Sequence, residues 1–97
     1  MQLHMSEQDV VDACCVYAAN HHGRRPEDVR VELWFEPGRG FGADANIGWS
    51  TVQLSEQQMV DAIAEYLAQY HNFNPQELNI QLQFPDESRI EAYIVVL

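Results

Sequence analysis

The chain has 97 residues, 46% of them hydrophobic, and a formal net charge of −10, a composition typical of a small folded protein and not of a disordered one. All five basic residues are arginines against fifteen acids, which argues against nucleic acid and anionic lipid as partners, because both are bound through clustered positive charge. No apolar run reaches the length of a membrane span and no basic start precedes an apolar segment, so we expect a cytoplasmic protein without a membrane partner or signal peptide.

The sequence contains two similar halves. Shifted by 49 residues, Met5–Gly48 aligns with Leu54–Leu97 without a gap, and 13 of the 44 aligned pairs are identical. Such self-similarity indicates an internal repeat. Because a chain of this length cannot build two independent cores, we predict a single domain over residues 1–97, whose halves, approximately 1–48 and 50–97, share one core.

The first half is predicted to form a β-α-β-β unit. Ser6, followed by an acid three residues on, marks the N-cap of a helix, and Gly23 with Pro26 marks its end. Apolar residues recur at helical spacing between these signals, and the flanking segments alternate apolar with polar residues as half-buried strands do. The expected elements are a strand at 2–5, a helix at about 6–22 and strands at 29–36 and 41–47.

The second half has the same order. Ser55 and Gln58 form a second capping box, Asn72 takes the place of the helix-ending glycine, and Gly48-Trp49 is a hairpin turn that joins the halves. The expected elements are a strand at 50–54, a helix at about 55–71 and strands at 78–84 and 90–96. We therefore predict an α+β fold in which a tandem internal repeat of β-α-β-β units forms one largely antiparallel sheet, with both helices packed on one face.

Two groups of residues suggest chemistry. Cys14-Cys15 with His21-His22 supplies zinc-ligand types, but the aligned positions of the cysteines hold isoleucine and alanine, so we predict no metal and no cofactor. His22 and His71 form the repeated ionisable pair. They either hydrogen-bond the last helical carbonyls, or they serve a hydrolytic or small-molecule-binding enzyme with a site between the halves. No nucleophile elbow, HExxH motif or lysine is present, so we predict no catalytic residue and favour a protein that is not an enzyme.

The sheet face that the helices leave uncovered carries the more informative residues. Alternation places Arg30, Trp34 and Tyr93 on this face, with Trp49 near the turn between the halves. Tryptophan, tyrosine and arginine are enriched at interfaces. The sequence therefore favours a non-enzymatic binding, regulatory or protein-interaction module that uses this face, as a homodimer and possibly with another protein partner.

Three phrases resemble a known family. They are Ser-Glu-Gln-x-x-Val-Asp-Ala at both predicted helix starts, His71-Asn72-Phe73-Asn74-Pro75, and Leu82-Gln83-Phe84. In these, the chain resembles the small YxcD-like proteins of Bacillus and related spore-forming Firmicutes, a family of unknown function. The resemblance extends over essentially the whole chain and implies a bacterial cytosolic setting. It brings no catalytic residues, because its motifs are helix caps, helix ends and strand patterns.

Overall fold

The computed structural model describes all 97 residues as two long helices and six strands, connected in part by short 3-10 turns. The helices are α1 (Glu7–His22) and α2 (Glu56–His71). The strands are β1 (Gln2–Met5), β2 (Val29–Glu36), β3 (Gly40–Ile47), β4 (Ser50–Ser55), β5 (Leu78–Gln83) and β6 (Glu91–Val96). The predicted order of strand, helix, strand and strand is present in both halves. Neither helix is long and apolar enough to cross a membrane.

The helix boundaries follow the predicted caps. The Ser6 hydroxyl accepts a hydrogen bond from the Asp9 amide, and the Asp9 carboxylate accepts one from the Ser6 amide. The same exchange occurs at the start of α2. Both helices end at a left-handed residue, Gly23 with φ 64° and Asn72 with φ 60°. An N-cap of this kind contributes about 1 kcal/mol, so both helix starts are fixed by local bonds.

The strands form two three-stranded antiparallel sheets, and the prediction of a single sheet is wrong. Sheet A has the order β1-β6-β5, and sheet B has the order β2-β3-β4. Each sheet takes two strands from one half of the chain and its third strand from the other half, since β1 pairs with β6 and β4 pairs with β3. Alternation in the sequence identifies strands but not their partners, which is why the division into two sheets was not predicted.

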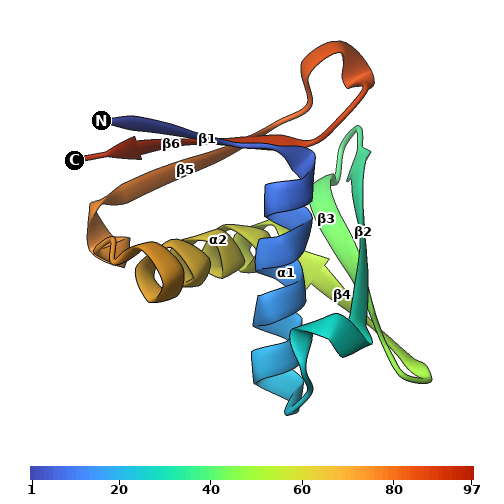
Figure 1. Cartoon of the computed structure of the whole chain (residues 1–97). Helices are drawn as coiled ribbons and strands as arrows, with labels where there is room; N and C mark the ends of the chain where they lie inside the picture. Colours follow the sequence, from blue (N-terminus) through green and yellow to red (C-terminus); the bar gives the residue numbers. More distant parts are fainter.

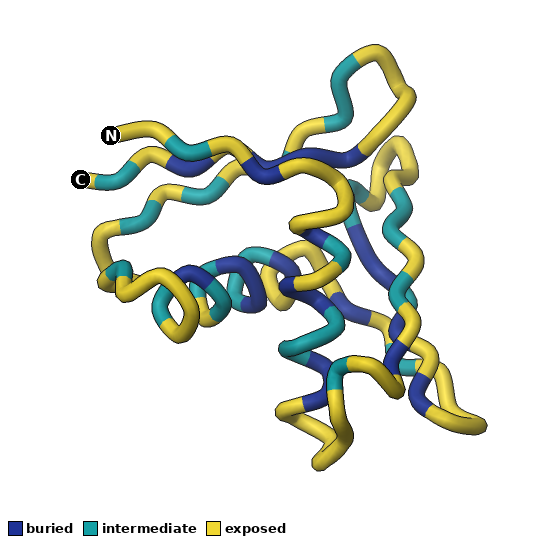
Figure 2. Tube along the Cα trace, viewed as in Figure 1, coloured by how far each residue is buried: buried dark blue, intermediate teal, exposed yellow.

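The helices fill the angle between the two sheets (Figure 1). α1 packs on β2 and β3 and also contacts β6, α2 packs on β5 and on β3 and β4, and the helices pack on each other. Both helices therefore contact both sheets. The prediction that they pack on one face of a single sheet is wrong. In Figure 2 the buried stretches lie on the helices and central strands that face this angle.

One cluster of twelve buried residues fills the angle and draws on both halves. Its largest fully buried members include Met59 and Ile63 of α2 and Val10 of α1. The central strands contribute alanines where the helices pack: Ala43 on β3 and Ala92 on β6 are both fully buried. Small residues on the strands let the helices approach closely, while burying each large aliphatic side chain contributes about 1.5–3 kcal/mol.

A matching pair of hydrogen bonds connects each helix start to the other half. The Glu7 carboxylate accepts a hydrogen bond from the Ile90 amide at 2.9 Å. The Glu56 carboxylate accepts one from the Phe41 amide at 3.1 Å. Glu56 and Ile90 lie 49 positions after Glu7 and Phe41. Each helix start is thereby held next to the opposite half, the start of α1 at the residue before β6 and the start of α2 at β3.

One aromatic side chain packs over part of the outer face of sheet B. Trp34 pairs with Gly42 across the β2–β3 ladder, and its indole lies so close that a Cβ on Gly42 would be 2.1 Å from the ring. The indole N–H donates to Asp44 Oδ1 at 3.2 Å, and the Arg39 guanidinium lies 4.7 Å from the ring centroid. Trp34 is therefore held across its own sheet, and glycine is required at position 42.

The outer face of sheet A carries a buried carboxylate at the position aligned with Gly42. Glu91 is 4% exposed. Its carboxylate accepts hydrogen bonds from the Arg89 guanidinium, from His4 Nε2 at 3.1 Å and from the Tyr93 hydroxyl at 3.4 Å. The bond from Arg89, and then that from His4, lowers the pKa of Glu91 below its ordinary value of 4.5, although burial opposes this.

This lowered pKa predicts an acid-sensitive contribution to stability. A carboxylate with a lower pKa in the folded state stabilises the fold above its unfolded pKa, and the contribution is lost as the pH falls through the folded pKa. Between about pH 6 and about pH 3, the urea midpoint of the wild type should therefore fall more steeply than that of Glu91→Gln, followed by circular dichroism. The control is Glu77→Gln, an exposed acid without a side-chain partner, which should keep the wild-type slope. Parallel curves for wild type and Glu91→Gln would contradict the assignment.

The close fit of Trp34 on Gly42 predicts a strong coupling between the two positions. We expect Gly42→Ala to lower the free energy of unfolding by about 1–3 kcal/mol, because the new methyl group must displace the indole. In a Trp34→Gln background, which copies the residue aligned with Trp34, the same change should cost nothing, since alanine is otherwise preferred over glycine in a strand. A double-mutant cycle measured by urea unfolding gives the coupling energy, and additive effects would show that the ring does not cover Gly42.

Candidate functional site

The four residues predicted to share one face lie on two different sheets. Arg30 and Trp34 lie on β2 and Trp49 lies in the β3–β4 turn, so these three belong to sheet B, with Trp34 toward one end of its strands and Trp49 at the other. Tyr93 lies on β6 and faces outward on sheet A. The separation follows from the division of the strands into two sheets. We refer to Arg30, Trp34, Asp44 and Trp49, with the residues between them on the outer side, as the sheet B face.

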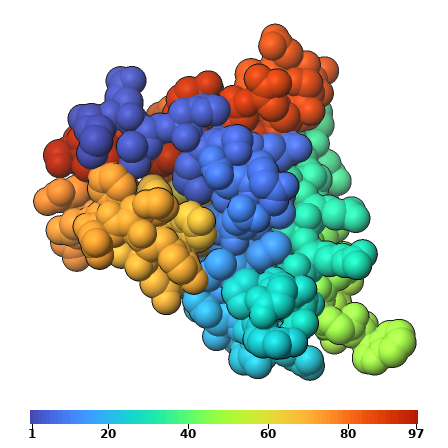
Figure 3. Space-filling view, viewed as in Figure 1, coloured from blue at the N-terminus to red at the C-terminus, as the bar shows by residue number.

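Trp49 is the most exposed of the large hydrophobic side chains. Its exposed fraction is 106%, so no neighbour covers any of its ring. It follows Gly48, which has a positive φ of 60°, in the two-residue connection between Ile47 and Ser50. In Figure 3 the segment coloured for residues near 50 projects from the body of the molecule. A short hairpin thus presents an uncovered indole to solvent.

The sheet B face carries both signs of charge. Arg30 and Glu32 lie on β2, and Asp44 on β3 accepts the hydrogen bond from Trp34. Arg39, which lies over the Trp34 ring, also forms an ion pair with Glu36 at 3.0 Å. In a chain with a net charge of −10, this face is therefore a region where positive and negative side chains are nearly balanced.

Tyr93 takes part in the arrangement around the buried carboxylate on sheet A. Its hydroxyl donates to Glu91 at 3.4 Å, and its ring centroid is 4.8 Å from that of His4. The ring remains 40% exposed. These contacts give Tyr93 a structural role that the sequence pattern alone does not reveal.

The structure does not bring His22 and His71 together. They end different helices, whose C-terminal ends point in different directions (Figure 1). His71 lines a small cavity of about 280 Å³ next to His4, Tyr66 and Phe73, whereas His22 lines neither this cavity nor the larger one described below. No group of three histidine, cysteine or acidic side chains is placed to hold a metal ion.

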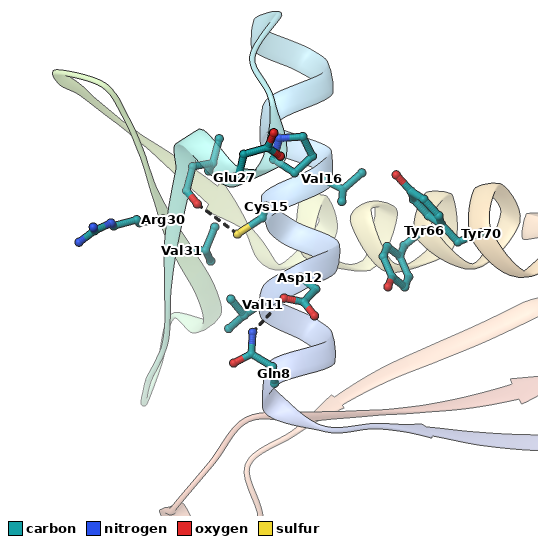
Figure 4. A pocket seen from close by; sticks show the side chains of 12 residues that line it. Gln8, Val11, Asp12, Cys15, Val16, Glu27, Arg30, Val31, Tyr66 and Tyr70 are labelled. Atoms are coloured by element: carbon teal, nitrogen blue, oxygen red, sulfur yellow. Dashed lines mark hydrogen bonds between the residues drawn. The ribbon is translucent and has the colours of Figure 1, made fainter.

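A larger groove of about 670 Å³ lies over the outer side of α1 and was not predicted (Figure 4). One wall consists of Pro26, Glu27 and the start of β2, and the opposite wall consists of Tyr66 and Tyr70 of α2. The floor is a second stripe of α1 at helical spacing, made of Gln8, Val11, Asp12, Cys15 and Val16. In the second half the position of Val16 is occupied by Glu65, and this difference is the sequence signal that could have indicated the groove.

The groove contains a thiol that is held in its protonated form. Cys15 Sγ donates to the Val29 carbonyl at 3.5 Å. Burial, followed by the charge of Asp12, raises the pKa of Cys15. Its neighbour Cys14 is fully buried, and burial raises its pKa to about 12. Because the thiolate is the nucleophilic form, neither sulfur is activated for covalent chemistry.

The groove also combines an acid with two aromatic rings. The Asp12 carboxylate accepts a hydrogen bond from the Gln8 side-chain amide at 2.9 Å. The centroids of Tyr66 and Tyr70 are 4.9 Å apart. Burial raises the pKa of Tyr66, and the charges of Asp12 and Asp9 raise it further. An arrangement of apolar side chains, tyrosine rings and a carboxylate is suited to binding a ligand.

The chain is similar to proteins without an assigned activity. The model of a family described as "Protein of unknown function (DUF2653)" matches residues 1–87. The uncharacterized protein YxcD of Bacillus subtilis (strain 168) is 44% identical over 55 residues, which cover 56% of this chain and 54% of that protein. The match thus spans about half of the relative's length, and no solved structure matches the chain. The resemblance to YxcD-like proteins is confirmed, and the chain belongs to the DUF2653 family of proteins of unknown function.

Proposed function

We propose that this protein is a non-enzymatic binding module that forms a homodimer through the sheet B face. The observation that carries the proposal is the complete exposure of Trp49 at the tip of a hairpin on the same sheet as Trp34. Tryptophan is the residue type most enriched among the residues that dominate binding energy at interfaces. A fully hydrated indole loses a large apolar area when a partner covers it, which favours association.

The charges of the sheet B face favour a second copy as the partner. Two chains of net charge −10 repel each other over most of their surface. Arg30 and Arg39 offset two of the three acids on this face, Glu32, Glu36 and Asp44, so the repulsion between two copies is reduced there. A twofold dimer brings the same patch of both copies together and requires the patch to be self-complementary. A patch with both signs of charge meets this requirement.

The size of the face sets the expected strength of the dimer. Eight-residue strands such as β2 and β3 extend over about 27 Å, and three strands are about 10–15 Å wide. This face and the Trp49 ring together offer roughly 500–650 Å², less than the ~800 Å² that each partner contributes to a standard interface. We therefore expect a weak, reversible dimer. The alternative enzyme site at His22 and His71 gains no support, because the two side chains line no common cavity.

The proposal predicts that removing the exposed indole weakens dimerisation. Between about 10 μM and about 1 mM protein, sedimentation equilibrium should detect a dimer for the wild type, and Trp49→Ser should raise its dissociation constant at least about tenfold. Arg30→Glu should also weaken the dimer, because it adds negative charge to the face.

The matched control is Tyr70→Ser, which removes an aromatic ring that is 53% exposed on α2, on the helix side of sheet B and not on its outer face. It should leave the dissociation constant unchanged. A wild type that stays monomeric over the whole concentration range, or a Trp49→Ser variant that dimerises like the wild type, would exclude this interface.

A further inference from the structure

The groove over α1 carries a second, separate inference. We propose that it binds a small organic cation with an apolar body, an amine or ammonium group attached to a hydrocarbon or aromatic moiety. The inference does not depend on dimerisation through the sheet B face. Figure 4 shows the side chain of Arg30 extending from β2 away from α1, whereas the groove lies on the α1 side of the strand.

The dimensions and lining of the groove suit a small molecule. Its volume of about 670 Å³ lies within the ~300–1,000 Å³ typical of ligand sites. Val11 and Val16 from the floor and Val31 from the wall supply apolar surface for the body of a ligand. All three are half-buried, so a ligand that covers them removes further apolar area from water.

The charge that faces the groove is negative. Asp12 is exposed on the floor, and the bond from Gln8 occupies its Oδ1, which orients the carboxylate and leaves Oδ2 available for a donor. Glu27 forms part of the rim on the β2 side, but its carboxylate is 3.7 Å from the Arg25 guanidinium, so the negative charge of the groove rests on Asp12. The one basic residue at the groove, Arg30, directs its guanidinium away from α1 (Figure 4). A positively charged group is therefore favoured over a negatively charged one.

The tyrosine pair strengthens this preference. The faces of aromatic rings attract cations, by about 0.5–1 kcal/mol at exposed sites and more where water is excluded. Tyr66 and Tyr70 stand next to each other on the wall that faces Asp12. Asp12 and Asp9 disfavour a negative charge on the Tyr66 hydroxyl. For the same electrostatic reason, these two carboxylates favour a positive charge near the Tyr66 ring.

The other half of the chain shows which differences create the groove. Asp61 accepts a hydrogen bond from Gln57 at 3.0 Å, just as Asp12 accepts one from Gln8. At the position of Tyr70, however, the first half has His21, whose ring centroid is 4.1 Å from that of Tyr17 and whose Nε2 is 3.8 Å from Glu65 Oε2. No cavity lies at this equivalent position. Asp61 is thus a matched control for Asp12.

The test is an NMR titration of the wild type with three ligands of nearly the same shape: 2-phenylethylamine, neutral 2-phenylethanol and anionic 3-phenylpropionate. At about 0.15 M salt, which screens long-range attraction to the acidic surface, we expect the amine to bind about tenfold more tightly than the alcohol, and the carboxylate most weakly. The amide signals of Val11, Val16 and Tyr70 should shift together. Equal affinities of amine and alcohol would overturn the proposal, as would the absence of amine binding.

Four variants distinguish binding of the amine in the groove from unspecific attraction of the amine to the acidic surface. Asp12→Asn should remove most of the preference for the amine while leaving the affinity for the alcohol unchanged. Tyr70→Ser should lower the affinity for both ligands several-fold. Asp61→Asn and Trp49→Ser should bind both ligands like the wild type. If Asp12→Asn and Asp61→Asn lose the same affinity, the amine binds to the acidic surface at large and the proposal fails. Because Trp49→Ser tests the dimer and leaves the groove intact, the two proposals can fail separately.

Discussion

The exchange of the first strands between the halves is the constraint on which the rest of the structure depends. A two-stranded ribbon is only marginally stable in water, so β5 and β6 need β1, and β2 and β3 need β4. Each helix must then run from one sheet to the other, because α1 connects β1 to β2 and α2 connects β4 to β5. This places both helices in the angle between the sheets, where they bury a common cluster of side chains. Glu7 and Glu56 hold the arrangement at the helix starts by accepting hydrogen bonds from the opposite half, from the residue before β6 and from β3 respectively.

The features that could be predicted from the sequence are those determined by neighbouring residues. Ser6 and Gly23 delimit α1 through bonds that reach only a few positions along the chain, and alternation in β2 correctly places Trp34 on the outside. Strand partners could not be predicted, because the pairing of β1 with β6 joins the two ends of the chain and leaves no local mark. Alternation alone predicts Tyr93 on the same sheet face as Trp34, whereas the division into two sheets puts them on different sheets. The groove could not be predicted because Val16 lies outside the main apolar stripe of α1. Val16 forms part of a binding surface only because the fold places Tyr66 and Tyr70 of α2 opposite it.

The aligned positions 42 and 91 show how the two halves differ without disturbing the core. Their inward-facing neighbours are the same residue, Ala43 and Ala92, and both are fully buried. On the outer side, Gly42 lies beneath the Trp34 ring, whereas Glu91 is enclosed by Arg89, His4 and Tyr93. Successive strand residues face opposite sides, so packing against the helices constrains one side and leaves the other free to change. The surfaces that distinguish the halves accordingly lie outside the shared core.

The strand β2 connects the fold to both proposed sites. Its even-numbered residues, including Arg30 and Trp34, face outward on sheet B, and its odd-numbered residues face the helices, with Val29 and Val31 at the groove. A slip of one residue in its pairing with β3 would exchange the two sets and bury the indole. Two contacts oppose the slip, the fit of Trp34 over Gly42 and the bond from the Cys15 thiol to the Val29 carbonyl. The first contact lies on the outer face and the second in the groove, so residues that shape the two surfaces also fix the register of the strand between them.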